Sequence, residues 1–462
     1  MVQQTACPIE GSILKKTVEL IHATRFEHWE SIRTEGLKGD PLISFTAVDH
    51  KSVKGCIAGV VAADLLIYVD VQKALQDGIQ FSPTSQPQTI VCEASALDVK
   101  YFAKVVNIRS GVILWTSKGD EEIHTLTSTE LRKMKLYSDA RVRYTLNKAV
   151  SIAYACGSSL KASDFGFVDQ LHYLGYECMD DFFGRYAADL QTMKNARAID
   201  IGTGMGGPAR YMQEQYGMQV TAIEYLHELV KICQIMNSLL QIPEERFNII
   251  KGDFSHMDVD YMQLEGQFQC MTAQLTFLHI ADKEDLFKRC SQVLVDGGYF
   301  MIEDYFLADD TELCPEDQQR LKDDVSVPTG VPLTEKRLRA LLEDNGLVVE
   351  EFEDMTDRWS VFIWERCEIF MADRPKLEAE HGVEYIQELG HFYTAVASVF
   401  HKLQCDDRTQ RYPNVCQAVK WSPALDGKAQ NLRGCRIMGR KKSALTNGAA
   451  NGLPKGVPNG VR

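Results

Sequence analysis

The sequence Asp200-Ile-Gly-Thr-Gly-Met-Gly-Gly207 decides the fold of this chain. It overlaps the apolar run Ala198–Ile201, which is typical of a buried strand, and precedes Ala209–Tyr216, which has a helical pattern. Its glycines permit a close approach and backbone conformations that other residues do not allow. They are Gly202, Gly204 and Gly206. We therefore expect a strand, a loop and a helix, with the loop lying directly against a cofactor.

Strands and helices alternate from about residue 161 onward, at the spacing of βαβ units. Besides the first strand, we expect strands at Gln219–Ile223, Phe247–Ile250, Phe268–Thr272 and Tyr299–Ile302. The expected helices include Leu229–Leu240 and Lys283–Leu294. The fold class predicted from this alternation is α/β, a Rossmann-like sheet with helices on both faces, together with a smaller N-terminal α+β domain.

Carboxylates are expected at the ends of three successive strands. Asp200 ends the first strand, Glu224 ends the second, and Asp253 follows the third. A carboxylate in the second position can accept hydrogen bonds from both ribose hydroxyls, while Asp253 can accept from an adenine amino group and Phe254 can cover the ring. Dinucleotide folds share the glycine spacing but have glycine where this chain has Asp200. The set indicates S-adenosylmethionine, although each carboxylate taken alone is also consistent with a solvated strand end.

Three stretches carry a resemblance to a known family: Asp200–Tyr211 (DIGTGMGGPARY), Ala273–Asp282 (AQLTFLHIAD) and Gly297–Tyr305 (GGYFMIEDY). Residues of about 161–441 resemble the class I S-adenosylmethionine-dependent methyltransferases. They are similar in particular to the small-molecule group that includes the phosphoethanolamine and sarcosine/dimethylglycine methyltransferases. The preceding stretch Phe165–Tyr176 (FGFVDQLHYLGY) is placed to form a helix over the cofactor.

Methyl transfer to a neutral nucleophile depends on alignment and a dry pocket more than on strong acid–base groups. The resemblance implies that His279 lies near the transferred methyl group, where it orients the substrate or accepts a proton. It also implies that Tyr173 is the tyrosine that closes the site. The other interpretation of His279 is a cap on the helix that begins near Asp282. Gln274, in the same loop, is a candidate contact for the cofactor or the substrate.

Two downstream segments leave alternatives open. The acidic stretch Leu307–Asp324 has no strong period and is either a lid or a solvated loop. The stretch Asp357–Trp364 has a strand-like pattern. Within it, Trp359 either faces a cationic substrate through cation–π attraction or belongs to the core.

The N-terminal region contains Leu20-Ile-His-Ala-Thr24, and residues 18–118 resemble the ADP-ribosyltransferase-type half of the tRNA 2′-phosphotransferases. His22 and Thr24 match the His-x-Thr element with which that family binds NAD. The chain departs from the family at its basic and catalytic segments, because Pro41–Ala47 contains neither Arg nor His and Ser82–Ser85 contains no Arg. We therefore expect a retained fold without transferase activity, in which His22 is a structural histidine.

These patterns divide the chain into four regions. Residues 1–125 are expected to form the degenerate RNA 2′-phosphotransferase-like α+β domain, 126–160 a helical connector, 161–441 the methyltransferase domain and 442–462 a disordered tail. Strands of the first domain are expected at Leu66–Val71, Val105–Ile108 and Val112–Trp115.

Composition limits the partners. The net charge of -14 makes the chain a poor candidate for binding a nucleic-acid backbone. The 13 cysteines have no metal-site spacing, so we expect no metal and a reducing compartment. Met1–Ser12 lacks the features of a signal peptide. The longest apolar run, Cys56–Val69, contains Asp64 and is shorter than the ~20 residues of a spanning helix. A soluble cytoplasmic protein is expected, with no membrane partner.

The sequence favours a small-molecule methyl acceptor without identifying it. An amine or amino-acid-like compound ranks first, a methylthio acid that becomes a sulfonium ranks second, and a lipid or quinone ranks third. Two functions of other classes remain open for the N-terminal region: an NAD-consuming RNA repair activity, and a binding module that forms a dimer surface or a substrate lid. A homodimer is also left open.

Overall fold

A computed structural model describes most of the chain. The described residues are 18–39, 42–49, 63, 65–84, 89–108, 113–117, 134–166, 168–186, 196–400, 408–420 and 431–443. The expected disordered tail lies almost entirely outside them, as do Met1–Ser12 and the first part of the expected connector. The chain forms two compact units. The first comprises Met1–Met134, Ile223–Lys231 and Ile249–Glu265, and the second comprises Lys135–Ala222, Ile232–Asn248 and Gly266–Arg462.

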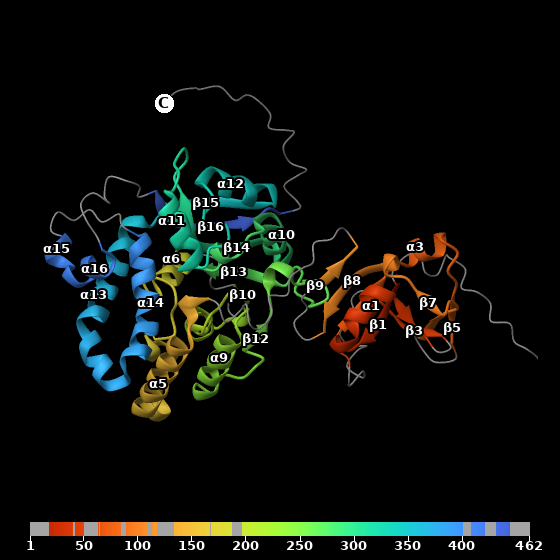
Figure 1. The fold of residues 1–462 in the computed structure, drawn as a ribbon, viewed down its shortest axis with the longest axis horizontal. Helices are drawn as coiled ribbons and strands as arrows, with labels where there is room; N and C mark the ends of the chain where they lie inside the picture. Colours follow the sequence, from red (N-terminus) through yellow and green to blue (C-terminus); the bar gives the residue numbers. More distant parts are fainter. Residues whose placement is uncertain are drawn as a thin grey trace, which may run out of the picture. The chain divides into compact units, whose positions relative to one another are not determined.

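The N-terminal part of the first unit is built around a seven-stranded sheet of order β5-β6-β3-β1-β4-β8-β9 (Figure 1). Its strands are β1 Val18–Thr24, β3 Ile43–Asp49, β4 Leu65–Val69, β5 Phe81–Pro83, β6 Thr89–Cys92, β8 Phe102–Asn107 and β9 Ile113–Thr116. β1 pairs antiparallel with both β3 and β4, and its Leu20 joins Phe45, Ile67 and Phe102 in the core. The three expected strands are present. The first is shorter than expected, because Asp70 accepts from the Lys73 amide and begins helix α3, Val71–Gln76.

The remaining small elements of this part connect the strands. Helix α1, Trp29–Glu35, follows a short 3-10 turn, and the strands β2 Leu37–Lys38 and β7 Ala96–Leu97 form a separate antiparallel pair. Gly36 has a φ of 77° at the end of α1. A Cβ there would lie 2.4 Å from the Leu97 carbonyl oxygen, so the turn into β2 requires glycine.

The larger sheet has the order β12-β11-β10-β13-β14-β16-β15. Its strands are β10 Arg197–Ile201, β11 Gln219–Glu224, β12 Phe247–Lys251, β13 Phe268–Gln274, β14 Leu294–Leu307, β15 Leu347–Asp354 and β16 Leu432–Lys441. β13 lies parallel to both β10 and β14, whereas β16 runs antiparallel to β14 and β15. Counted in chain order within this sheet, the strands are arranged 3-2-1-4-5-7-6. The first five positions match a doubly wound sheet, and in the last two the seventh strand lies before the sixth. The predicted fold class is confirmed.

Helices follow the strands as the sequence predicted. They are α8 Gly207–Tyr216, α9 His227–Leu239, α10 Lys283–Val293 and α12 Glu335–Asp344. A second group lies side by side at one end of the second unit: α5 Asp139–Cys156, α13 Thr356–His381 and α14 Val383–Val399 (Figure 1). The short helices α15 Arg408–Arg411 and α16 Pro413–Ala418 complete this group. Apolar side chains of α13, α14 and α16 share one core with the far end of β14.

The expected strand at Asp357–Trp364 is wrong, because these residues form the first turns of α13. Their buried positions include Trp359, Ile363 and Cys367, which are four residues apart and therefore share one helix face. The aromatic residues raised the strand propensity of this stretch, but the helical spacing decides its structure. Trp359 is completely buried, which supports the core interpretation of its side chain.

The segment Phe165–Tyr176 is not the helix that its position suggested. Gly166, Leu174 and Gly175 have φ values of 56°, 60° and 66°, a backbone conformation that ends a right-handed helix. The chain instead passes through turns and begins helix α6 at Glu177, which continues to Arg185.

The acidic stretch Leu307–Asp324 is neither a plain loop nor an extension of the sheet. β14 ends at Leu307, and Pro315–Asp323 forms helix α11. Leu313 and Leu321 are buried in the same core as Trp359. The acidic residues hid two buried leucines, Leu313 before the helix and Leu321 within it, so the interpretation as a solvated loop is wrong.

Candidate functional site

The glycine loop after β10 is closely packed against the turn that follows β13. Gly202, Gly204 and Gly206 have φ values of 69°, 59° and 84°. A Cβ on Gly202 would lie 2.2 Å from Cγ2 of Thr276, and the Thr276 hydroxyl donates to the Gly202 carbonyl over 3.2 Å. Glycine is required at this position both by backbone conformation and by the close approach of the two loops.

Asp200 is a buried hydrogen-bond acceptor that organises this loop. Its side chain is 1% exposed and accepts hydrogen bonds from the hydroxyls of Thr203, over 2.6 Å, and Thr272, over 2.7 Å. Burial raises its pKa to about 6. The alternative of a solvated strand end is therefore excluded for Asp200, while a direct contact with cofactor stays a prediction.

Glu224 and Asp253 belong to the first unit and are also engaged. Glu224 is buried, and its carboxylate accepts from the Leu226 amide over 2.7 Å. Asp253 accepts from the amide of Ser255 over 2.9 Å and from Nδ1 of His256 over 2.8 Å. Although burial raises the pKa of Asp253, these bonds lower it below its usual value. The carboxylate therefore stays ionised.

Phe254 opens the 3-10 turn after Asp253, and its ring is buried. His256, which closes that turn, bonds to Asp253 and was not singled out in the sequence. A histidine three residues after a strand-end aspartate is a local signal that could have found it.

A buried ion pair holds the chain segment before β10 against the glycine loop. Arg210 of α8 is completely buried and donates to Asp169 over 2.8 Å, to the Met205 carbonyl over 2.5 Å and to Asn237 over 3.0 Å. A Cβ on Gly207 would lie 2.9 Å from the Asp169 carbonyl oxygen. The segment therefore lies over the loop, in turns rather than in the expected helix, and its position over the cofactor stays a prediction.

His279 ends the 3-10 turn Phe277–His279 and lies three residues after Thr276, which contacts Gly202. Its Nδ1 lies 2.9 Å from the Ser326 carbonyl oxygen, which can only accept, so Nδ1 carries the proton. Nε2 is then an acceptor, and the hydroxyl of Tyr137 donates to it over 3.3 Å. Burial lowers the pKa of His279 to about 4, so the ring is neutral at pH 7.

The capping interpretation of His279 is wrong. Helix α10 is capped by Asp282, whose carboxylate accepts from the Asp285 amide over 3.0 Å. Strained backbone flanks the histidine instead: Leu275 and Ser326 have φ values of 50° and 63°. Such conformations in non-glycine residues persist only where the surroundings enforce them, and they are frequent at functional sites.

Tyr173 lies in the core against which Tyr137 packs, but its hydroxyl forms a hydrogen bond with another residue. Its hydroxyl is 2.5 Å from the hydroxyl of Tyr305, and its ring packs edge-on against Trp359 with centroids 5.0 Å apart. Burial raises its pKa well above the usual value. Tyr137 is therefore the tyrosine that hydrogen-bonds His279. Sequence reasoning missed it, because Tyr137 lies in the expected connector and no motif marks it.

Gln274 ends β13 and is buried opposite Glu303 of β14. Its amide lies 4.0 Å from the Cys178 sulfur of α6. Glu303 is 1% exposed and pairs with Arg436 over 2.9 Å, and burial raises its pKa to about 7. The Gln274 side chain thus sits at the edge of a buried polar network.

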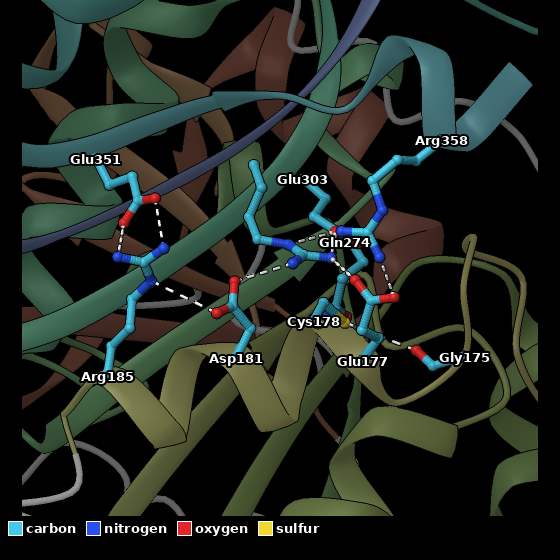
Figure 2. A network of polar contacts seen from close by, with 10 residues as sticks. Gly175, Glu177, Cys178, Asp181, Arg185, Gln274, Glu303, Glu351 and Arg358 are labelled. Atoms are coloured by element: carbon cyan, nitrogen blue, oxygen red, sulfur yellow. Dashed lines mark hydrogen bonds and ion pairs between the residues drawn. The ribbon is translucent and has the colours of Figure 1, made fainter.

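That network fixes α6 to the sheet (Figure 2). Arg436 also binds Asp181 in the middle of the helix over 3.0 Å, and Arg358 binds Glu177 at its first residue, so cations from two other elements hold the helix. Arg185 of the same helix pairs with Glu351 of β15. The covering segment 168–176 therefore runs into a firmly anchored helix.

The larger domain is similar to known proteins. Residues 171–351 match a family model described as a methyltransferase domain. The resemblance to the methyltransferases is confirmed. The matched range includes the glycine loop, Gln274 and His279, whereas Tyr137 precedes it and Arg366 of α13 follows it.

Individual relatives match this chain over only part of its length and with modest sequence identity. A sarcosine/dimethylglycine N-methyltransferase from Halorhodospira halochloris is 31% identical over 160 residues, which are 34% of this chain and 53% of the relative. The sterol 24-C-methyltransferase erg6 of Schizosaccharomyces pombe is 22% identical over 42% of this chain and 55% of its own length. This chain thus spans about half the length of the curated relatives it matches. A Haemonchus contortus phosphoethanolamine N-methyltransferase structure aligns with a TM-score of 0.41 and 15% identity, over 58% of this chain and 56% of that one.

The N-terminal resemblance is confirmed as well. Residues 3–94 match the family described as RNA 2'-phosphotransferase, Tpt1 / KptA family. His22 Nδ1 donates to the Ser44 carbonyl over 3.0 Å, its ring packs edge-on against Phe45, and burial lowers its pKa. Ser82 donates to Glu93 over 2.6 Å. These contacts agree with a structural role for His22.

Within the part of the chain that the structure describes, no helix is both long and apolar enough to cross a membrane.

Proposed function

We propose that this chain is an S-adenosylmethionine-dependent methyltransferase that methylates a small molecule, with the nitrogen of an amine or amino-acid-like compound as acceptor. The observation that carries the proposal is the contact of Thr276 with Gly202, which brings the turn bearing His279 directly beside the glycine loop. The match to the methyltransferase family and the sarcosine/dimethylglycine relative support the reaction and the class of acceptor.

The residues present fit this cofactor. The loop from Gly202 to Gly206 turns through left-handed glycines, so no Cβ covers its backbone at these positions, where the methionine end of the cofactor is expected. Glu224 and Asp253 supply carboxylates for the ribose and the adenine amino group, and Phe254 supplies a ring face. Bound there, S-adenosylmethionine supplies an electrophilic methyl group on a sulfonium sulfur.

The chain's own groups act mainly by alignment. Because the pKa of His279 is lowered to about 4, the neutral ring is a weak base for an ammonium ion. Its Nε2 instead fixes the direction of the Tyr137 hydroxyl, whose oxygen can accept a hydrogen bond from the substrate. The buried rings of Tyr173, Tyr305 and Trp359 exclude water from this side of the site. We assign Tyr137 and His279 to orientation of the acceptor.

One observation favours a second candidate, S-methylation of a methylthio acid to a sulfonium. A thioether has no proton to lose, so a weakly basic His279 is no disadvantage. The aromatic rings next to Tyr173, which include Trp359 and Phe400, would also stabilise a cationic product through cation–π attraction. The N-terminal domain is proposed to be a degenerate module without transferase activity, and a cytoplasmic location is proposed for the whole chain.

A labelled-methyl screen tests the proposal. The purified full chain is incubated with S-adenosylmethionine carrying a labelled methyl group and with small amines, amino acids, thiols and methylthio acids. Transfer to at least one acceptor is expected, and His279→Ala should lower turnover roughly tenfold to hundredfold while leaving cofactor affinity unchanged. His381→Ala, which alters an exposed histidine at the end of α13, is the matched control.

The proposal fails if no compound is labelled while S-adenosylhomocysteine binds tightly. A loss of cofactor affinity in His279→Ala without a loss of turnover would remove the histidine from the acceptor site.

A further inference from the structure

Two arginine side chains from different helices converge on one phenol oxygen. Arg141 of α5 donates to the hydroxyl of Tyr393 of α14 over 2.9 Å, and Arg366 of α13 also hydrogen-bonds to this phenol. Burial raises the pKa of Tyr393, yet the charges and hydrogen bonds of the two guanidinium groups outweigh burial and lower it. The phenol oxygen therefore lies in a strongly positive environment.

Arg141 carries its charge into the protein interior. It is only 2% exposed, its Nε is buried without a hydrogen-bond partner, and its guanidinium lies 4.4 Å from the centre of the Phe392 ring. No carboxylate of the described residues pairs with it. The nearby Glu388 accepts from the amide of Ala140. A buried cation is costly unless an anion compensates it.

Arg366 interacts electrostatically with Arg141. Burial and the positive charge of Arg141 both lower the pKa of Arg366. Arg366 and Tyr393 are each partly exposed, whereas Arg141 is buried, so the cluster lies where the interior meets the surface. Neighbouring arginines are a common arrangement at sites that bind a carboxylate or a phosphate.

The arginine pair borders the proposed acceptor site. Arg141 lies in the first turn of α5, one helical turn after Tyr137, the partner of His279. On the other side, Arg366 lies 5.7 Å from the ring of Phe362, and that ring is 6.2 Å from the ring of Tyr173. The positive charge of Arg366 acts on Tyr173 itself, where it opposes the rise in pKa caused by burial.

We propose that Arg141, Arg366 and the Tyr393 hydroxyl form a subsite for an anionic group of the methyl acceptor, either a carboxylate or a phosphate monoester. This inference rests on the proposed function and narrows it. Guanidinium groups present planar pairs of donors that match the oxygens of both anions, and the Tyr393 hydroxyl adds a third donor. The anion is held at α5, α13 and α14, and the reacting atom of the acceptor extends toward Tyr137 and His279.

The subsite discriminates among the acceptor classes that the relatives suggest. An amino acid, a methylthio acid or a phosphoethanolamine-like compound supplies the missing negative charge. A sterol-like acceptor does not, and would leave the buried charge of Arg141 uncompensated. The acceptor is therefore a small, anionic molecule.

The experiment compares compounds that carry a carboxylate or a phosphate with analogues that lack it. The full chain is assayed with sarcosine and N-methylglycinamide, with 4-(methylthio)butanoate and its amide, and with phosphoethanolamine and ethanolamine. At least one acid should be preferred over its analogue without the anionic group by roughly tenfold or more in kcat/KM. The pair that shows the preference distinguishes a carboxylate from a phosphate.

Variants locate the effect. Arg366→Gln alters a half-buried side chain and should raise KM for the preferred acid roughly tenfold, with little change in kcat or in S-adenosylhomocysteine affinity. Arg141→Lys retains the charge but loses the planar donors, and should raise KM less than Arg141→Gln does. Arg143→Gln, two residues further along α5, is the matched control and should leave KM unchanged.

Binding separates this inference from the proposed function. The same acids and amides are titrated calorimetrically into the chain loaded with S-adenosylhomocysteine. Binding of an acid that is lost in Arg366→Gln supports the subsite even if nothing is methylated, a result that would sink only the proposed function. Equal use of acids and of the analogues without the anionic group, or an unchanged KM and binding affinity in Arg366→Gln, overturns the subsite.

Discussion

The Nε2 atom of His279 lies 3.3 Å from the hydroxyl oxygen of Tyr137, although the two residues are 142 positions apart in sequence. The Ser326 carbonyl holds the proton on Nδ1, so the hydrogen bond between the two side chains has one direction only. The pair joins the turn after β13 to the residues just before α5. It therefore couples the expected cofactor side of the site to the expected acceptor side.

Removal of this bond should slow turnover without weakening cofactor binding. Tyr137→Phe keeps the ring but removes the hydroxyl, and we expect kcat to fall roughly tenfold to hundredfold. Tyr144→Phe, in the same α5 region, is the control and should retain full activity. Steady-state kinetics and S-adenosylhomocysteine titration measure both effects. An unchanged kcat in Tyr137→Phe would contradict the assigned role.

The packing of the glycine loop predicts a site-specific loss of cofactor affinity. Gly202→Ala places a methyl group 2.2 Å from Cγ2 of Thr276 and adds strain at a φ of 69°. Gly217→Ala carries the strain at a φ of 66° but meets no atom within 4 Å, and should cost only about 1–2 kcal/mol of stability. Calorimetric titration should show strong loss of S-adenosylhomocysteine binding in Gly202→Ala alone. Equal affinities in the two variants would show that the loop contact is unimportant.

The buried pair of Arg210 and Asp169 predicts strong coupling between two substitutions. Arg210→Met leaves the Asp169 carboxylate buried without its cation, which should cost about 3–5 kcal/mol of the free energy of unfolding. Replacement of both residues, with Asp169→Leu as the second change, should cost clearly less than Arg210→Met alone. Denaturant unfolding of the single and double variants measures this. Additive losses would mean that the pair makes no coupled contribution.

The lowered pKa of His279 predicts an acid-sensitive contribution to stability. The unfolded histidine binds a proton as the pH falls below about 6.5, whereas the folded one does so only near 4. Its contribution to stability is therefore complete above pH 6.5 and is lost as the pH falls toward 4. His279→Gln should lose less stability between pH 7 and pH 5 than the wild type does. Asp200, whose pKa is raised to about 6, acts in the opposite sense but equally in both proteins. Identical pH dependence in the two proteins would contradict the burial of a neutral His279.

Local sequence patterns were sufficient for the sheet around the glycine loop. Ala198–Ile201 and Phe268–Thr272 alternate with helical stretches, and each pattern is determined by neighbours a few residues away. The positive φ values of Gly202 and Gly206 were expected for the same reason. The strand prediction for Asp357–Trp364 failed, because aromatic residues have high strand propensity and only the spacing of the buried ones reveals the helix.

The long-range contacts of the site could not be obtained in this way. Tyr137 reaches His279, and Arg141 meets Arg366 and Tyr393, only because α5 packs against α14, which no local pattern encodes. The Asp169 partner of Arg210 is equally distant in sequence. Side-chain pairs of this kind depend on the tertiary arrangement of helices, so they became visible only in the structure.

The rate of labelled methyl transfer to the best acceptor, at saturating S-adenosylmethionine, tests the central claim most directly. It is measured for the wild type, His279→Ala, Tyr137→Phe and the control His381→Ala. We predict transfer by the wild type and the control, and a roughly tenfold to hundredfold lower rate in each of the other two variants. Equal rates in all four proteins, or no transfer by a wild type that binds S-adenosylhomocysteine, would contradict the claim that this site methylates a small molecule.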